Sequence, residues 1–291
     1  MRKHLLTLAC AALLGAPATA GAITFADGLP HIIDATNSFP NDTIEVMDGP
    51  GSTTTTVTVV DGGEAGLLPL DGFGSPTRIG IDASQNSAVN VDGGEVSSVF
   101  LSDFAVATIT GGRNICGLRM SGSSQATISG GDMGSKCFGP TIELQGDATL
   151  AITGGVIQRA FTASDSSVID VTGGIFGVPD QGCVAEAGGN STVTISGGDW
   201  RIGTPERCTF LASGNEGQIT VVGTDFNFPL GDLPGGPPGI LTGTLADGSP
   251  LDVVYASSDG GVITLVPEPT TALLLPCALA GLASAHRRRV E

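Results

Sequence analysis

Residues 147–157 read DATLAITGGVI, and residues 166–176 read SSVIDVTGGIF. In both stretches apolar residues alternate with polar ones immediately before a pair of glycines. An alternation with a period of two predicts a short β-strand with one buried face. The glycine pair predicts a tight corner, because glycine adopts positive φ without steric cost. Each stretch therefore predicts a strand followed by a corner.

This strand–corner unit repeats along the chain. Seven copies carry their first glycine at Gly93, Gly111, Gly130, Gly154, Gly173, Gly197 and Gly223, with spacings of 18, 19, 24, 19, 24 and 26 residues. A unit of this length cannot bury its own apolar face, whereas stacked units can. Constant strands with variable spacing predict an all-β fold, a right-handed parallel β-helix of roughly eight or nine coils. A β-sandwich is the rival, but hairpin turns of the Asn-Gly type are scarce.

The inward positions of the predicted strands follow from the same alignment. They lie two and four residues before each first glycine: Val91, Ile109, Ile128, Ile152, Val171, Ile195 and Val221, and Val89, Ala107, Ala126, Leu150, Ile169, Val193 and Ile219. Each unit also has a second apolar stretch, such as residues 160–163 or 208–212, which predicts a second strand in every coil.

The ends of a solenoid need caps, because an open end exposes unpaired strand edges. We expect residues 21–60 to hold the N-terminal cap (23–48) and the first strands, and residues 61–228 to form the repeats. Residues 229–265 predict a Pro/Gly linker followed by capping strands at 251–255 and 261–265.

The N-terminal residues 1–20 predict a secretory signal peptide. Arg2 and Lys3 precede an apolar run, and Ala18-Thr19-Ala20 follows as a small-x-small site, which predicts cleavage after Ala20. The chain is therefore expected to be exported.

Charge excludes one class of partner. The chain has 12 Lys plus Arg and 29 Asp plus Glu, and residues 21–265 keep seven basic against 27 acidic side chains, a net charge of −20. So acidic a surface repels nucleic acid and anionic membranes. We expect no nucleic-acid partner.

Four cysteines remain between the two terminal segments. Cys116 and Cys137 are 21 residues apart, and Cys183 and Cys208 are 25 apart, about one coil in each case. Adjacent rungs lie about 4.8 Å apart, within the reach of a disulfide. We predict the bridges Cys116–Cys137 and Cys183–Cys208, each contributing about 2–4 kcal/mol in an oxidising compartment. The alternative is a ladder of free buried thiols; zinc is not favoured, because no C-x-x-C is present.

The C-terminus joins three elements. Val266-Pro267-Glu268-Pro269 precedes an apolar run at 270–285, and Arg287, Arg288 and Arg289 follow it. As a helix the run is about 24 Å long, short of a bilayer core of about 30 Å. It therefore predicts transient insertion in the membrane, with the arginines on the cytoplasmic side.

Residues 266–291 resemble the PEP-CTERM sorting signal of Gram-negative bacteria that produce exopolysaccharide. The resemblance implies recognition and processing by exosortase, a membrane protease of the cysteine-transpeptidase type, with the precursor in the inner membrane. It implies a mature protein in the cell envelope or the extracellular matrix. The body also resembles the glycine-rich, β-helical exported proteins that carry this tail.

Two functions remain open for the body. The first is a structural or matrix-associated protein without catalysis, linked to exopolysaccharide. The second is a polysaccharide lyase or hydrolase, or a Ca²⁺-dependent carbohydrate-binding protein, because such sites need converging carboxylates. The best cluster of this kind is Asp199, Trp200, Arg201 and Asp225, which are weak ligand candidates. The alternative for Trp200, which the pattern favours, is a packing residue at a corner. We assign no catalytic residue, metal site or cofactor, and Ca²⁺ is not placed; we expect no enzyme.

Overall fold

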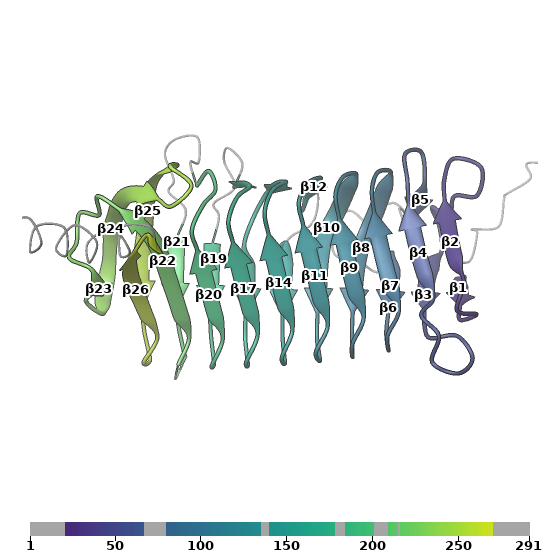
Figure 1. The fold of residues 1–291 in the computed structure, drawn as a ribbon, viewed down its shortest axis with the longest axis horizontal. Coiled ribbons are helices and arrows are strands. Elements are labelled where there is room, and N and C mark those ends of the chain that lie inside the picture. The colour runs from purple at the N-terminus through teal and green to yellow at the C-terminus, as the bar shows by residue number, and fades with distance from the viewer. Residues whose placement is uncertain are drawn as a thin grey trace, which may run out of the picture.

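The structure is a computed structural model, and it describes residues 21–66, 80–134, 140–177, 184–200, 209–214 and 216–269. Every strand in these ranges belongs to one continuous ladder of 26 strands. Strand pairing is parallel except where β23 (Gly231–Asp232) and β24 (Gly236–Leu245) join near the C-terminal end. Figure 1 shows the coils stacked side by side along one axis. The prediction of an all-β, parallel, solenoid-like fold is confirmed; the two expected terminal helices lie outside the described residues.

Sheet 1 contains the strands that the glycine-pair repeat predicts. Its ten described strands are β2 (Pro30–Ile33), β4 (Thr56–Val59), β7 (Ala88–Val91), β9 (Val106–Ile109), β11 (Gln125–Ile128), β14 (Thr149–Ile152), β17 (Val168–Val171), β20 (Thr192–Ile195), β22 (Gln218–Thr224) and β26 (Val262–Pro267). Each pairs in register with the strand of the next coil, so equivalent residues form straight columns along the axis.

Sheet 2 lies beyond the corner and is narrow. It consists of β5 (Glu64–Ala65), the first parts of β8 (Glu95–Leu101) and β10 (Arg113–Met120), β12 (Asp132–Met133), β15 (Val156–Ile157) and β18 (Ile175–Phe176). A bulge between Asn114 and Gly117 separates the two parts of β10.

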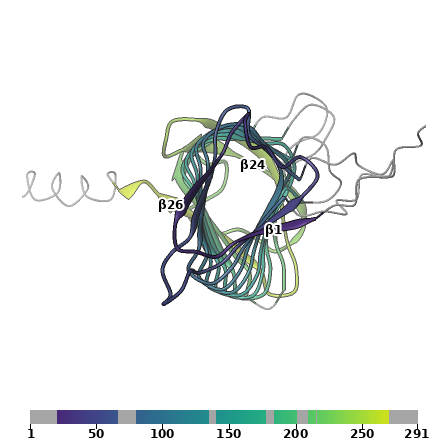
Figure 2. The ribbon, with the colours of Figure 1, turned by 90° about the vertical axis from the view of Figure 1, so that its right-hand side faces the viewer.

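Sheet 3 returns the chain to the start of the next coil. It consists of β1 (Ala22–Phe25), β3 (Thr43–Val46), β6 (Ile81–Ala83), the second parts of β8 and β10, β13 (Ile142–Leu144), β16 (Phe161–Ala163), β19 (Val184–Ala187), β21 (Thr209–Ala212) and β25 (Pro250–Ser257). These are the second strands that the sequence predicts. Figure 2, seen along the axis from the N-terminal end, shows the three faces superimposed from coil to coil.

The glycine pairs turn the chain from sheet 1 to sheet 2 for two reasons. The second glycine of the pair has positive φ in consecutive coils, +73° at Gly112 and +85° at Gly131, as predicted. The stacking of coils adds a steric reason, because a Cβ on Gly112 would lie 2.5 Å from the carbonyl oxygen of Gly93 in the preceding coil. The corner therefore needs glycine both for its own conformation and for the close approach of its neighbour.

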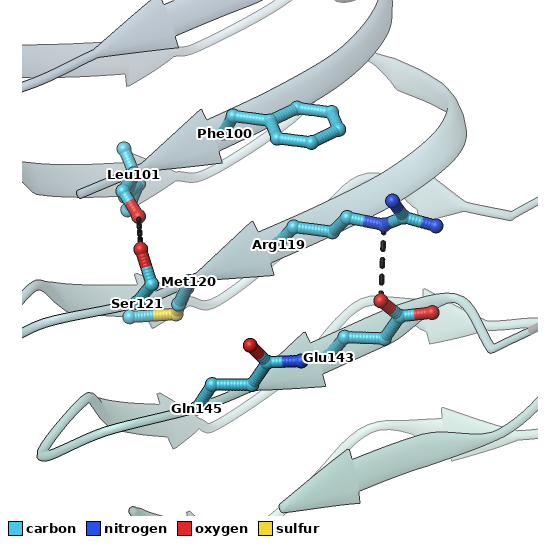
Figure 3. A pocket seen from close by; sticks show the side chains of 7 residues that line it. All are labelled: Phe100, Leu101, Arg119, Met120, Ser121, Glu143 and Gln145. Atoms are coloured by element: carbon cyan, nitrogen blue, oxygen red, sulfur yellow. Dashed lines mark hydrogen bonds and ion pairs between the residues drawn. The ribbon is translucent and has the colours of Figure 1, made fainter.

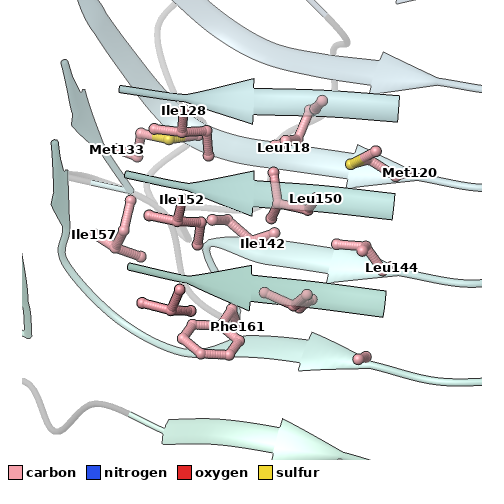
Figure 4. Packing of buried hydrophobic residues seen from close by; sticks show 14 of the residues in the cluster. Leu118, Met120, Ile128, Met133, Ile142, Leu144, Leu150, Ile152, Ile157 and Phe161 are labelled. Atoms are coloured by element: carbon pink, nitrogen blue, oxygen red, sulfur yellow. The ribbon is translucent and has the colours of Figure 1, made fainter. Parts of the chain in front are cut away.

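The core fills the space between the three sheets. Every inward position that the alignment predicts is buried, and Figure 4 shows Ile128, Ile152 and Leu150 stacked in columns against Ile142 and Phe161 of sheet 3. Complete burial of such a side chain contributes about 1.5–3 kcal/mol. Because each coil buries its apolar residues against the next, the repeat itself provides the stability of the fold.

The two ends of the solenoid differ from the expected caps. The segment 23–48 is itself the first coil, because β1 and β2 already pair in parallel with β3 and β4. Two strands that the sequence did not predict, β23 (Gly231–Asp232) and β24 (Gly236–Leu245), begin within the Pro/Gly segment. β24 pairs antiparallel with β25 and has a register shift between Gly236 and Gly239, where two prolines stand. Proline is tolerated there because residues in a bulge do not donate a backbone hydrogen bond to the neighbouring strand.

Candidate functional site

One outward-facing column of sheet 3 brings together an aromatic ring, a cation and a carboxylate. Phe100 of β8, Arg119 of β10 and Glu143 of β13 are direct neighbours in register. Parallel in-register pairing places equivalent side chains of successive coils side by side, about 4.8 Å apart. Figure 3 shows the three side chains pointing to the same side of the sheet.

The guanidinium group of Arg119 makes contacts with both neighbours. Its Nε lies 3.0 Å from Oε2 of Glu143, and its Cζ lies 5.4 Å from the centroid of the Phe100 ring. An exposed ion pair contributes only about 0–1 kcal/mol to stability, and an exposed cation–π contact a similar amount. These contacts therefore serve mainly to position the side chains.

A shallow hollow of about 240 Å³ lies over this column. It is lined by Phe100, Leu101, Arg119, Met120, Ser121, Glu143 and Gln145. Ser121 Oγ donates a hydrogen bond of 3.4 Å to the carbonyl oxygen of Leu101. A ligand in this hollow could stack on the Phe100 ring. The guanidinium, carboxylate, hydroxyl and amide groups around the ring could form hydrogen bonds with the same ligand. We call this hollow the sheet-3 groove.

The sheet-3 groove lacks the pair of carboxylates that glycoside hydrolysis requires. Glu143 is the only carboxylate among its lining residues, and Arg119 already binds it. General acid–base cleavage of a glycosidic bond uses two carboxyl groups at a defined separation.

The acidic end of the same column lies one coil before Phe100. Asp82 pairs in register with Phe100 on one side and with Glu45 on the other. Partial burial raises the pKa of the Asp82 carboxyl above its ordinary value, and the neighbouring charge of Glu45 raises it further. Negative charge therefore accumulates on this part of sheet 3.

Trp200, the aromatic member of the predicted ligand cluster, points into the core. It is 1% exposed and stacks on Phe176 with ring centroids 4.0 Å apart, and its Nε1 donates a hydrogen bond to the Gly197 carbonyl oxygen. Phe161 and Phe210 complete the aromatic cluster at 6.0 Å and 4.9 Å. A ring in this position presents no face to a sugar; Arg201 lies outside the described residues.

The column of residues two positions after each first glycine is present in sheet 2. It runs through Glu95, Arg113, Asp132, Val156, Ile175 and Asp199. Asp225 does not join it, so the expectation that Asp199 and Asp225 are column neighbours was wrong. The reason is that β22 continues past the corner position to Thr224 and pairs there with β24. Asp225 instead lies exposed after this strand.

Within the described ranges, no group of three or more His, Cys, Asp or Glu side chains could hold a metal ion. Helices long and apolar enough to cross a membrane are likewise absent from the part of the chain that the structure describes. The predicted insertion segment 270–285 lies outside that part.

The remaining predicted residues are only partly described. Cys116 lies on β10, but Cys137, Cys183 and Cys208 lie outside the described part of the structure, so both predicted pairings stay predictions. Ala18, Ala20 and the three arginines also lie outside. Val266 and Pro267 end β26, and Glu268 and Pro269 follow it.

Comparison with protein-family models, with curated proteins and with solved structures finds no match for this chain. The fold and the groove must therefore carry the functional argument. Sequence reasoning missed the groove, although one signal was present: Phe100, Arg119 and Glu143 are 19 and 24 residues apart, each separation a coil length.

Proposed function

We propose that this chain is an exported, surface-sorted structural protein of a polysaccharide matrix, without catalysis, and that it contacts neutral polysaccharide through the sheet-3 groove. The observation that carries the proposal is the placement of Phe100, Arg119 and Glu143 on three successive coils. A sugar ring can stack its apolar face on an aromatic side chain while the adjacent charged and amide groups bind its hydroxyls.

Charge favours a neutral polymer over an acidic one. The net charge of −20 over residues 21–265 repels polyanions, and the acidic pair Glu45 and Asp82 lies in the same column as the groove. The single cation of the column, Arg119, is already bound by Glu143. A neutral chain of hexoses meets no such repulsion.

Export and sorting rest on the two ends of the sequence. The signal peptide predicts release after Ala20, and the resemblance of residues 266–291 to the PEP-CTERM signal favours processing by an exosortase-type protease. The mature protein would then reside in the envelope or the extracellular matrix of a Gram-negative bacterium. There the disulfides Cys116–Cys137 and Cys183–Cys208 would form between neighbouring coils.

The winding that we propose for the solenoid is right-handed. The strands of sheet 1 run upward in Figure 1 while the coils advance from right to left. In Figure 2, viewed from the N-terminal end, the same sheet lies on the left. Seen from the N-terminal end, the chain therefore rises on the left while successive coils recede from the viewer, which is a clockwise turn. A clockwise turn that recedes from the viewer supports a right-handed helix.

Binding is tested with exopolysaccharide purified from the producing cells, separated into neutral and acidic fractions and fixed on beads. We expect retention by the neutral fraction, and a loss of about five- to tenfold in affinity for Phe100→Ala, because one stacked ring contributes about 1 kcal/mol. Phe104→Ala is the matched control, because Phe104 is 62% exposed but does not line the groove. Equal binding by both variants would contradict the groove's role.

Sorting is tested separately by reading both termini of the mature protein. Native cells are fractionated and the intact mass of the chain is measured. We expect a chain that begins at Gly21 and lacks the apolar run, in the surface or matrix fraction. A chain with an intact tail in the inner membrane would contradict processing and leave the tail as an anchor.

A further inference from the structure

The first strand of the solenoid is held along one edge only. β1 pairs in parallel with β3, and no second strand among the described residues pairs with it. Short strands at the end of a fold open more readily than strands in its interior. The contacts that tie β1 to β3 therefore largely determine whether the first coil stays closed.

Two carboxylates of the second coil tie β1 down, one near each end of the strand. The backbone N–H of Gly21 donates a hydrogen bond of 2.9 Å to Oδ1 of Asp42. The carbonyl oxygen of Gly21 accepts a hydrogen bond of 3.1 Å from the N–H of Thr43. Near the other end of β1, Thr24 Oγ1 donates a hydrogen bond of 3.0 Å to Oε2 of Glu45.

The carboxylate of Asp42 is available to a cation. Asp42 belongs to none of the ion pairs between described residues. A Cβ on Gly21 would lie 3.1 Å from Oδ1 of Asp42, so glycine permits the close approach of the two groups. The partly exposed Asp42 therefore directs an unpaired negative charge at the Gly21 nitrogen.

Removal of the predicted signal peptide changes the chemistry of this nitrogen. Hydrolysis breaks the C–N bond between Ala20 and Gly21, and the oxygen of the water stays on the Ala20 carboxylate. Gly21 keeps an α-amino group, which is mostly protonated at neutral pH. One N–H thus becomes a cation with three donors, and a charge-assisted hydrogen bond is roughly twice as strong as a neutral one. The net charge of −20 over residues 21–265 also favours a cation here.

We propose that Asp42 is the binding site for the α-ammonium group that cleavage creates at Gly21, so that removal of the signal peptide closes the first coil. The proposal rests on the export step of the proposed function, because it requires cleavage after Ala20. Before cleavage, a single hydrogen bond joins the two residues. After cleavage, an ion pair holds the start of β1 against the second coil.

The test compares two forms of the chain from Gly21 to Glu291, one with a free α-amino group and one acetylated at that group. Acetylation keeps an N–H and removes the positive charge. Hydrogen exchange of the amides of residues 22–33 measures how often the first coil opens. We expect about two- to fivefold faster exchange in the acetylated form, the size of effect that an exposed ion pair produces. In Asp42→Asn, acetylation should not change the exchange rate.

Glu45→Gln is the matched control. It removes a carboxylate from the same strand pair, but one that binds Thr24 rather than Gly21. The effect of acetylation should persist in this variant at its wild-type size. Each variant is compared with its own acetylated form, so a change in its overall stability does not affect the comparison.

Three results would overturn the proposal. Equal exchange of the two wild-type forms would mean that the charge adds nothing to the contact. A persistent effect in Asp42→Asn would mean that the ammonium group pairs elsewhere. Loss of the effect in Glu45→Gln would mean that the general negative field, rather than Asp42, holds the group.

The N-terminus of the mature protein from the producing cells separates this proposal from the export step. A mature chain that begins elsewhere than at Gly21 would overturn both the predicted cleavage and the closure that depends on it. A mature chain that begins at Gly21, together with no effect of acetylation, would overturn the closure alone.

Discussion

The outer faces of sheet 1 and sheet 3 share one ladder but carry different chemistry. One outward column of sheet 1 is dominated by hydroxyl groups: Thr58, Thr108, Thr127, Thr194, Thr220 and Thr264 occupy the same register position. The corresponding column of sheet 3 carries Glu45, Asp82, Phe100, Arg119 and Glu143. Threonine suits an exposed strand because its branched Cβ favours extended backbone.

The difference shows how a solenoid separates stability from function. The inward columns of both sheets are apolar and bury the same kind of surface, so the backbone spacing is fixed from within. The outward columns can then vary with little cost, because exposed positions affect stability by only about 0.5 kcal/mol. The outward column of sheet 1 is rich in threonine, with Ile32, Ala151 and Asp170 among its other members, whereas sheet 3 concentrates charge and an aromatic ring.

The largest effect is expected from the interior of sheet 3. Phe161→Ala removes a fully buried ring that contacts Trp200 and Phe176, and we expect a loss of about 3–5 kcal/mol in the free energy of unfolding. Ile152→Val on the interior of sheet 1 is the comparison, with an expected loss of about 0.5–1.5 kcal/mol. Urea titration measures both. Equal losses would show that the aromatic cluster has no special role in the core.

The corners that join the sheets are expected to come next. Gly112→Ala combines a positive φ with a collision against the preceding coil, whereas Gly248→Ala has a positive φ of +87° and open space around its Cβ. We expect the Gly248 variant to lose about 1–2 kcal/mol, and the Gly112 variant about 1–3 kcal/mol more because of overpacking. Urea titration measures both losses. Equal losses would mean that neighbouring coils move apart to accept the extra methyl group without a cost in stability.

A smaller, pH-dependent effect is expected from the acidic end of sheet 3. The pKa of Asp82 is raised in the folded protein, so its ionised form disfavours folding, and the wild-type protein gains stability as pH falls through that pKa. Asp82→Asn should therefore raise the melting temperature at pH 7 and leave it nearly unchanged below about pH 3, where the carboxyl is mostly protonated in both states. Asp170→Asn on sheet 1 controls for the loss of one negative charge. A lower melting temperature for Asp82→Asn at pH 7 would contradict this account.

The smallest effect is expected on the outer face of sheet 1. Thr127 is exposed, and none of the described residues hydrogen-bonds its hydroxyl. Thr127→Val keeps the branched shape, so we expect a stability change within about 0.5 kcal/mol and no change in polysaccharide retention. A loss of retention as large as that of Phe100→Ala would place the binding face on sheet 1 and overturn the distinction between the two faces.

The sequence predicted the parts of the fold that have a period. Alternation before Gly154 and Gly173 identified the strands of sheet 1 and their inward residues, because burial on one face enforces a period of two. Corner residues have no such period, so Trp200 had two interpretations, a ligand contact and the favoured packing residue at a corner; its burial confirms packing. The strand β24 was missed because its Gly-Pro-Pro start is typical of a loop. The groove was missed because exposed positions are under no packing constraint.

The direction of the hydrogen bonds also determines how this molecule responds to tension. The hydrogen bonds between coils run along the solenoid axis. A pull on the two chain ends therefore breaks the bonds of an end coil one after another, rather than the bonds of all coils at once. Each coil that peels away frees about 20 residues, which extend to about 70 Å. A chain held by its C-terminal end in a matrix would lengthen stepwise, beginning at an end strand and absorbing work with each coil. The stacked architecture is therefore an extensible tether as well as a rod.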